Sequence, residues 1–77
     1  PALALVAGDQ GLDAIDIIAR EVRELLAEDG LLVLEHGAEQ RELVEQLLQS
    51  YGWTSIQCYD DYSGLPRVTS AKYSETT

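Results

Sequence analysis

The sequence has few basic residues. Its 77 residues include 5 lysines and arginines against 14 aspartates and glutamates, which gives a formal net charge of -9. Proteins bind nucleic acids largely by neutralising phosphates with Lys and Arg. We therefore expect no direct contact between this surface and nucleic acid. The simplest role of the acidic charge is to keep a small protein soluble.

Long apolar runs and cysteine pairs are also missing. The longest apolar runs, residues 2–7 and 31–34, are far shorter than the roughly 20 residues that cross a bilayer, and no basic segment precedes them as in a signal peptide. The single Cys58 can form neither an internal disulfide nor a cysteine metal cluster. We expect a cytoplasmic protein without a membrane partner.

The sequence contains no methionine and begins with Pro1, so we expect a piece of a longer protein. A chain of this size forms one domain at most and buries only about 60% of its unfolded surface. That is too little for a large, self-contained enzyme.

The spacing of apolar residues predicts two helices. In residues 13–28 the apolar positions recur every three or four residues, with Asp13 as the N-cap and Gly30 in a left-handed position after the last turn. Residues 39–51 repeat the pattern, with Gly52 as the cap. Between them, residues 31–34 have the continuous apolar character of a strand buried on both faces.

The remaining segments predict a turn and a hairpin. Residues 8–11 have the glycines of a turn and lack the pattern of a phosphate-binding loop. Residues 54–59 and 67–73 are rich in β-forming residues, and 60–66 is too short for a crossover helix. We therefore expect an α/β fold in the order helix, strand, helix and antiparallel β-hairpin, with both helices on a three-stranded sheet.

The candidate site residues are Glu35, His36 and Arg67. Ligands of open α/β sheets bind at the carboxyl ends of parallel strands, which is where strand 31–34 runs into Glu35 and His36. Adjacent residues of an extended chain point to opposite faces, so these two either line a site separately or have a structural role such as helix capping. Arg67 either pairs with Asp60 or Asp61 or contacts a substrate.

No other residue carries a specific signal. Asp60 and Asp61 lack further metal ligands at a recognisable spacing. Cys58 alternates inward with Ile56, as a small buried hydrophobic residue does. The residues therefore predict no catalytic, cofactor-binding or metal site in this chain by themselves.

Three motifs in order carry a family resemblance. These are Leu-Glu-His-Gly at 34–37, Tyr-Gly at 51–52 and Asp-x-x-Gly-x-x-Arg-Val at 61–68. From Pro1 to about Tyr73, the sequence resembles the C-terminal part of the HemK (PrmC) family, the release factor glutamine methyltransferases.

The resemblance implies a class I methyltransferase fold that depends on S-adenosyl-methionine, a seven-stranded Rossmann-like sheet with its last strand inserted antiparallel. Residues 31–35, 54–59 and 67–73 would be its fifth, sixth and seventh strands. The family methylates the side-chain amide nitrogen of the glutamine in the Gly-Gly-Gln motif of peptide-chain release factors.

The family's glycine-rich cofactor loop, its Asn-Pro-Pro-Tyr motif and its ribose-binding acid have no counterpart in these residues. The resemblance therefore implies that residues 1–77 are a C-terminal fragment of the catalytic domain, inactive alone and unable to bind the cofactor. Glu35, His36 and Arg67 would lie near the substrate.

Two alternatives remain: a complete small acidic interaction module that docks a partner through a sheet edge or helix face, and a methyltransferase of the same fold with another substrate. For the isolated chain we also expect self-association, through an apolar edge exposed at strand 31–34.

Overall fold

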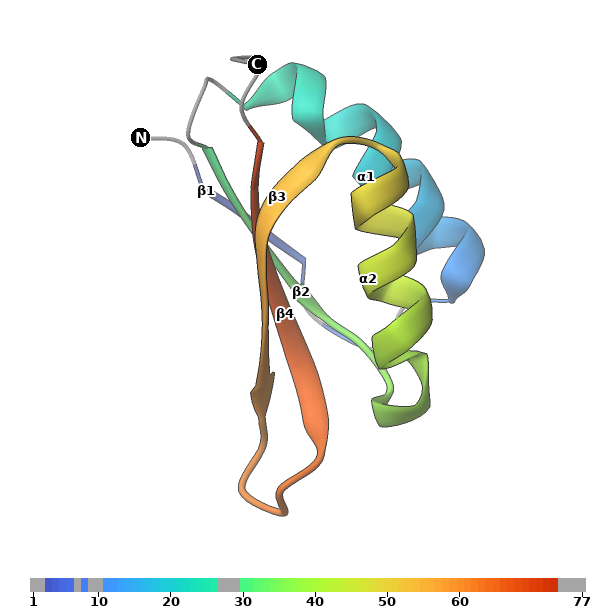
Figure 1. Cartoon of the computed structure of the whole chain (residues 1–77), viewed down its shortest axis with the longest axis vertical. Coiled ribbons are helices and arrows are strands. Elements are labelled where there is room, and N and C mark those ends of the chain that lie inside the picture. Colours follow the sequence, from blue (N-terminus) through green and yellow to red (C-terminus); the bar gives the residue numbers. More distant parts are fainter. Residues whose placement is uncertain (1–2, 7, 9–10, 27–29, 74–77) are drawn as a thin grey trace.

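The structure, a computed structural model, describes residues 3–6, 8, 11–26 and 30–73. It is a mixed four-stranded sheet with two helices on one of its faces (Figure 1). In chain order the elements are β1 (Leu3–Val6), α1 (Leu12–Leu25), β2 (Gly30–Glu35), a short 3-10 helix η1 (Ala38–Gln40), α2 (Arg41–Ser50), β3 (Trp53–Asp60) and β4 (Pro66–Tyr73).

The strand order is β1-β2-β4-β3. Strands β1 and β2 are parallel, whereas β4 is antiparallel to both of its neighbours. Consequently β1, β2 and β3 run in one direction and β4 is inserted between β2 and β3. The predicted antiparallel hairpin is confirmed, with Pro66 at its loop end, where the missing N–H does no harm.

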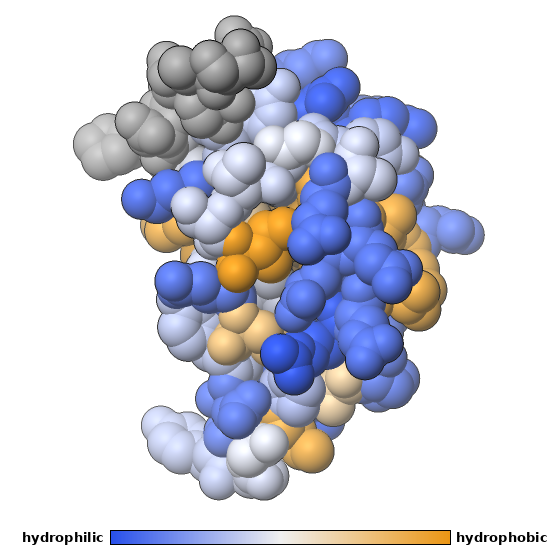
Figure 2. All heavy atoms as spheres, in the orientation of Figure 1, coloured by the Kyte–Doolittle hydropathy of each residue, from blue (hydrophilic) through white to orange (hydrophobic). Residues whose placement is uncertain are grey.

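One core lies between the helices and the sheet. Its buried hydrophobic residues are Ile15, Ala19, Leu32, Leu34, Val44, Leu48, Trp53 and Ala71. Each helix contributes two buried residues from consecutive turns of its apolar stripe, and the outer surface of α2 is largely hydrophilic (Figure 2). The indole Nε1 of Trp53 donates a 2.8 Å hydrogen bond to the carbonyl of Ala19, so the one buried indole is satisfied.

A β-bulge adjusts the register of β3. Ser55 has a φ of 52°, and the pairing with β4 shifts between Thr54 and Gln57. The extra residue lets Trp53 and Ile56 both contact the core although they are an odd number of residues apart. Ile56 and Cys58 thus lie opposite Ser55 and Gln57, as the alternation predicts, and Cys58 is half-buried.

The prediction of a three-stranded sheet was wrong, because residues 3–6 form a fourth strand. β1 pairs in parallel with β2, from Leu3 opposite Leu31 to Val6 opposite Leu34. This pairing satisfies backbone groups of β2 that an edge strand leaves open. The expected exposed edge at residues 31–34 is therefore occupied, and the edge strands of the sheet in the described residues are β1, next to β2, and β3 on the opposite side.

The predictions about both ends of α1 were also wrong. The helix begins at Leu12 with Gly11 as N-cap, and Asp13 lies inside the first turn, where its charge still favours the helix dipole. Gly30 is the first residue of β2 instead of a left-handed cap. Gly52, by contrast, has the predicted left-handed conformation after α2, with a φ of 89°. The helix also ends earlier than the predicted residue 28, because Leu26 has an extended backbone. Residues 27–28 of the prediction and the tail 74–77 fall outside the described residues.

Candidate functional site

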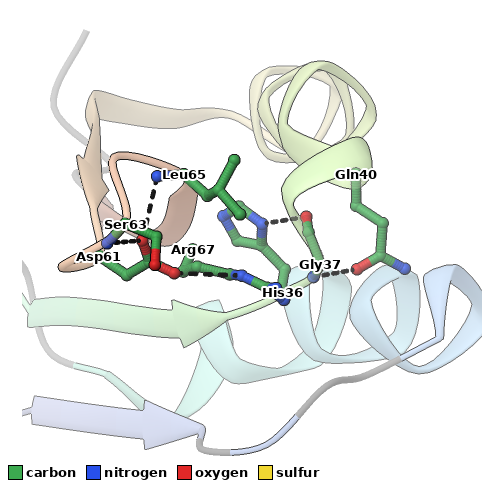
Figure 3. A network of polar contacts seen from close by, with 7 residues as sticks. All are labelled: His36, Gly37, Gln40, Asp61, Ser63, Leu65 and Arg67. Atoms are coloured by element: carbon green, nitrogen blue, oxygen red, sulfur yellow. Dashed lines mark hydrogen bonds and ion pairs between the residues drawn. The ribbon is translucent and has the colours of Figure 1, made fainter.

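The candidate residues lie at the edge of the sheet where β1, β2 and β3 end. There the segment after β2 meets the base of the β3–β4 hairpin (Figure 3). The backbone N–H of His36 donates a 2.9 Å hydrogen bond to the carbonyl of Arg67 and so continues the β2–β4 ladder by one residue. Glu35 pairs with Val68 in the same ladder. The three candidates therefore occupy neighbouring strands at one edge.

His36 is completely buried. Its Nδ1 lies 2.9 Å from the carbonyl oxygen of Gly37, and its Nε2 lies 2.7 Å from Oγ1 of Thr69. A carbonyl can only accept, so Nδ1 donates to it, and in that tautomer Nε2 accepts from the Thr69 hydroxyl. Both ring nitrogens are thus used inside the protein. Of the two roles left open by the sequence, the structural one accounts for every polar atom of the ring.

The turn after His36 is held by a second contact. The Gly37 N–H donates to Oε1 of Gln40 at 2.8 Å, and the Gln40 N–H donates to the Gly37 carbonyl at 3.0 Å. This reciprocal pair closes the first turn of η1, in the manner of a capping box. The segment that leaves β2 is therefore fixed before α2 begins.

Glu35 has a different environment from its neighbour. It is exposed, and its Oε1 accepts a 3.0 Å hydrogen bond from the N–H of Gly8, in the segment that follows β1. Glu35 and His36 therefore form no acid–base pair, as the extended backbone predicts. The carboxylate instead connects the ends of the two parallel strands.

Arg67 pairs with Asp61, one of the two partners that the sequence offered. The Arg67 Nε lies 3.5 Å from Oδ2 of Asp61, and the side chains of Arg67 and Asp61 are 39% and 33% exposed. The other carboxylate oxygen accepts hydrogen bonds from the N–H groups of Leu65 at 3.0 Å and Ser63 at 2.8 Å. These bonds, the Leu65 N–H first and Arg67 last, hold the pKa of Asp61 below its usual value.

Two hollows on the described surface are lined by residues other than Glu35, His36 and Arg67. One hollow of about 340 Å³ lies between the helices and is lined by Leu12, Asp13, Asp16, Leu43, Gln46 and Leu47. Another, of about 430 Å³, lies on the sheet face away from the helices and is lined by Leu31, Val33, Ser55, Gln57, Tyr59, Ser70 and Lys72. The three candidates share an edge but do not enclose a site within the described residues.

The described residues also contain no cluster of three or more metal ligands. None of the helices in the described part of the chain is both long enough and apolar enough to pass through a bilayer.

Sequence reasoning missed a polar link between the helices. The Tyr51 hydroxyl donates to Asp16 at 2.7 Å, and this bond, with partial desolvation, raises the pKa of Tyr51. Arg23 donates to the Tyr51 carbonyl at 2.9 Å, and its guanidinium lies 6.0 Å from the Tyr51 ring and 5.9 Å from that of Tyr73. The partners are 28 or more residues apart, so local patterns give no signal for the link.

It also missed the exposure of Tyr62, which stands at the hairpin tip with its side chain fully in solvent. In the sequence Tyr62 is one of several scattered aromatic residues. Only its place between two paired strands, two residues before Gly64, indicates that it stands on a tight loop.

No family model matches the chain. Curated proteins do: the release factor glutamine methyltransferase of Coxiella burnetii is 42% identical over 72 residues, which cover 94% of this chain and 26% of that protein. Those of Neisseria gonorrhoeae and Escherichia coli K12 are each 38% identical over 73 residues, 95% of this chain and 27% and 26% of theirs.

The chain is related to the release factor glutamine methyltransferases. The resemblance found in its motifs is thereby confirmed along nearly its whole length. The chain spans about a quarter of the length of these curated methyltransferases, 26% to 27%.

Proposed function

We propose that the protein containing this chain transfers a methyl group from S-adenosyl-methionine to the side-chain amide nitrogen of the glutamine in the Gly-Gly-Gln motif of a peptide-chain release factor. The observation that carries the proposal is the similarity, over 94% to 95% of the chain, to proteins that are named release factor glutamine methyltransferase. Residues 1–77 would form the C-terminal part of the catalytic domain.

The strand order supports the finer proposal of a Rossmann-like class I sheet. In that fold the last strand is inserted antiparallel next to the fifth, and β4 lies between β2 and β3, antiparallel to both. On this assignment β2, β3 and β4 are the fifth, sixth and seventh strands. The rest of the sheet lies beyond β2 on the side of β1.

The open face of the sheet supports the proposal that more chain covers it. Leu3 and Leu5 are each 64% exposed, and they pair with Leu31 and Val33, which line the hollow on the face away from the helices. Parallel strands are normally covered on both faces. The relatives are about four times as long as this chain, so the remainder of such a protein supplies enough residues for a second layer.

The described residues of this chain do not fit the cofactor. The polar side chains at the carboxyl edge are already engaged: His36 bonds Thr69 and the Gly37 carbonyl, and Gln40 and Asp61 accept from nearby backbone N–H groups. Neither hollow includes them. We therefore assign the binding of S-adenosyl-methionine to the rest of the protein and expect the 77 residues alone to be inactive. Glu35 and Arg67 would lie near the substrate, and the buried His36 would hold the backbone of Arg67.

The test uses the full-length protein, purified release factor and S-adenosyl-methionine with a labelled methyl group. We expect label on the release factor, and none when alanine replaces the glutamine of its Gly-Gly-Gln motif. The 77-residue chain alone should transfer none. Label on a ribosomal protein or a nucleic acid would favour a methyltransferase with another substrate. Absence of transfer to any substrate would favour an interaction module.

A further inference from the structure

We propose that the tip of the β3–β4 hairpin, with Tyr62 and Leu65, is a docking surface for the protein substrate. This inference rests on the proposed function. The hairpin tip would bind the folded release factor at a surface other than the reacting glutamine. The contacts described above account for Asp61 and Arg67, but they give the side chains of Tyr62 and Leu65 no role.

The position of the tip is the first argument. The hairpin extends beyond the rest of the molecule (Figure 1), at the edge where β1, β2 and β3 end. Ligands of open α/β sheets bind at that edge. When a macromolecular substrate inserts its reacting group at that edge, the substrate surface around this group lies next to the hairpin that projects from the edge.

The order of the loop is the second argument. Asp61 closes it with its carboxylate, which accepts from two backbone N–H groups, and with its own N–H, which donates to the Leu65 carbonyl at 2.8 Å. The Gly64 N–H donates to the Asp61 carbonyl at 3.0 Å, and Gly64 has a φ of 80° that favours glycine. A loop fixed in advance loses little conformational entropy on binding.

The side chains on this ordered loop are the third argument. Tyr62 is fully exposed and Leu65 is 42% exposed, although the loop itself is held by backbone and carboxylate contacts that need neither side chain. Tyrosine is enriched among the residues that contribute most to protein interfaces, because it offers a large contact area at low entropic cost. At the base of the hairpin the acids Glu35 and Asp60 are exposed as well, which suits a partner surface that combines an apolar side chain with positive charge.

The base of the hairpin connects the tip to the end of β2. The bond from the His36 N–H to the Arg67 carbonyl and the bond between His36 and Thr69 fix β4 against the segment after β2. A substrate held by the tip would thus have a defined position relative to the carboxyl edge.

The experiment measures steady-state methylation of the intact release factor by the full-length enzyme. In the double variant Tyr62→Ala/Leu65→Ala we expect KM for the release factor to rise about tenfold, as loss of an interface anchor does, with kcat within about twofold. Tyr62→Phe keeps the ring and should keep KM. Leu43→Ala removes a leucine of similar exposure, 46%, from α2 and should also leave KM unchanged.

The outcomes separate the two proposals. A wild-type enzyme that does not methylate the release factor overturns both. An active wild type whose double variant keeps KM within about twofold overturns the docking role alone. A double variant that loses kcat and affinity for S-adenosyl-methionine, with KM for the release factor unchanged, contradicts docking as well, because the tip would then act on the fold of the enzyme.

Discussion

The two faces of the sheet differ although the same strands build them. On the helix-covered face of β2, Leu32 and Leu34 are completely buried, whereas Leu31 and Val33 on the other face line an open hollow. The first face is a finished core. The second is apolar over β1 and β2, while Ser70 and Lys72 of β4 contribute polar groups beside it. Strand β2 is thus buried on one face only in this chain, although its residues are apolar on both faces, as in strands that are covered on both sides.

Leu32→Ala and Leu31→Ala test this comparison most directly, because the two leucines are adjacent in β2. We expect Leu32→Ala to lower the free energy of unfolding by about 2–5 kcal/mol, since it removes a completely buried side chain and leaves a cavity. Leu31→Ala should cost about 1 kcal/mol or less, because this side chain is half-buried at an open hollow.

Urea unfolding of the 77-residue chain measures both values. Equal losses for the two variants would contradict the difference between the faces. In the full-length protein the two losses should become similar, because Leu31 would then be covered as well.

Self-association of the isolated chain is the second prediction. The structure moves its expected origin from β2 to β1, whose outer edge is unpaired within the described residues and which carries the exposed Leu3 and Leu5. We expect light scattering to report species larger than a monomer at high micromolar concentration. Leu5→Lys should shift the population towards monomer by adding a charge to the apolar face. A clean monomer for the unchanged chain would contradict the prediction.

The elements that could be predicted are those with local signals. The stripes of α1 and α2, the left-handed Gly52 and the five-residue loop that forces an antiparallel hairpin all depend on residues close in the sequence. Strand β1 was missed because four apolar residues are too few to show a period, even with the predicted turn at residues 8–11 after them. Its identity as a strand comes from a partner, β2, that lies 28 residues away in register.

The topology predicted where the candidate residues lie in the fold, but it did not predict the contacts of their side chains. The rule that ligands meet the carboxyl ends of strands selected Glu35 and His36, and the predicted hairpin put Arg67 at the start of the last strand. The structure places all three at the same edge. The rule could not show that the hydroxyl of Thr69, 33 residues further on, forms a hydrogen bond with the ring of His36. Nor could it decide between Asp60 and Asp61 as the partner of Arg67, because that choice depends on which carboxylate turns inward to close the loop.

The smallest expected effect is a pH dependence of the free energy of unfolding that comes from Asp61 in the hairpin loop. It distinguishes the ordered tip from the rest of the molecule. The folded pKa of Asp61 is lowered, chiefly by the hydrogen bond from the Leu65 N–H. A lowered folded pKa means that the carboxylate contributes stability above its unfolded pKa, about 4. This contribution is lost as the pH falls through the lower, folded value. Asp61→Asn should therefore be less stable than the unchanged chain at pH 6, and the difference should shrink as the pH falls below about 4.

Urea midpoints measured between pH 6 and pH 3 would show this convergence. Asp60→Asn is the matched control, because Asp60 is the adjacent exposed acid. Its difference from the unchanged chain should vary less with pH over the same range. A difference for Asp61→Asn that stays constant over this range would mean that the loop does not depend on the charged carboxylate, and would remove the second argument for an ordered docking tip.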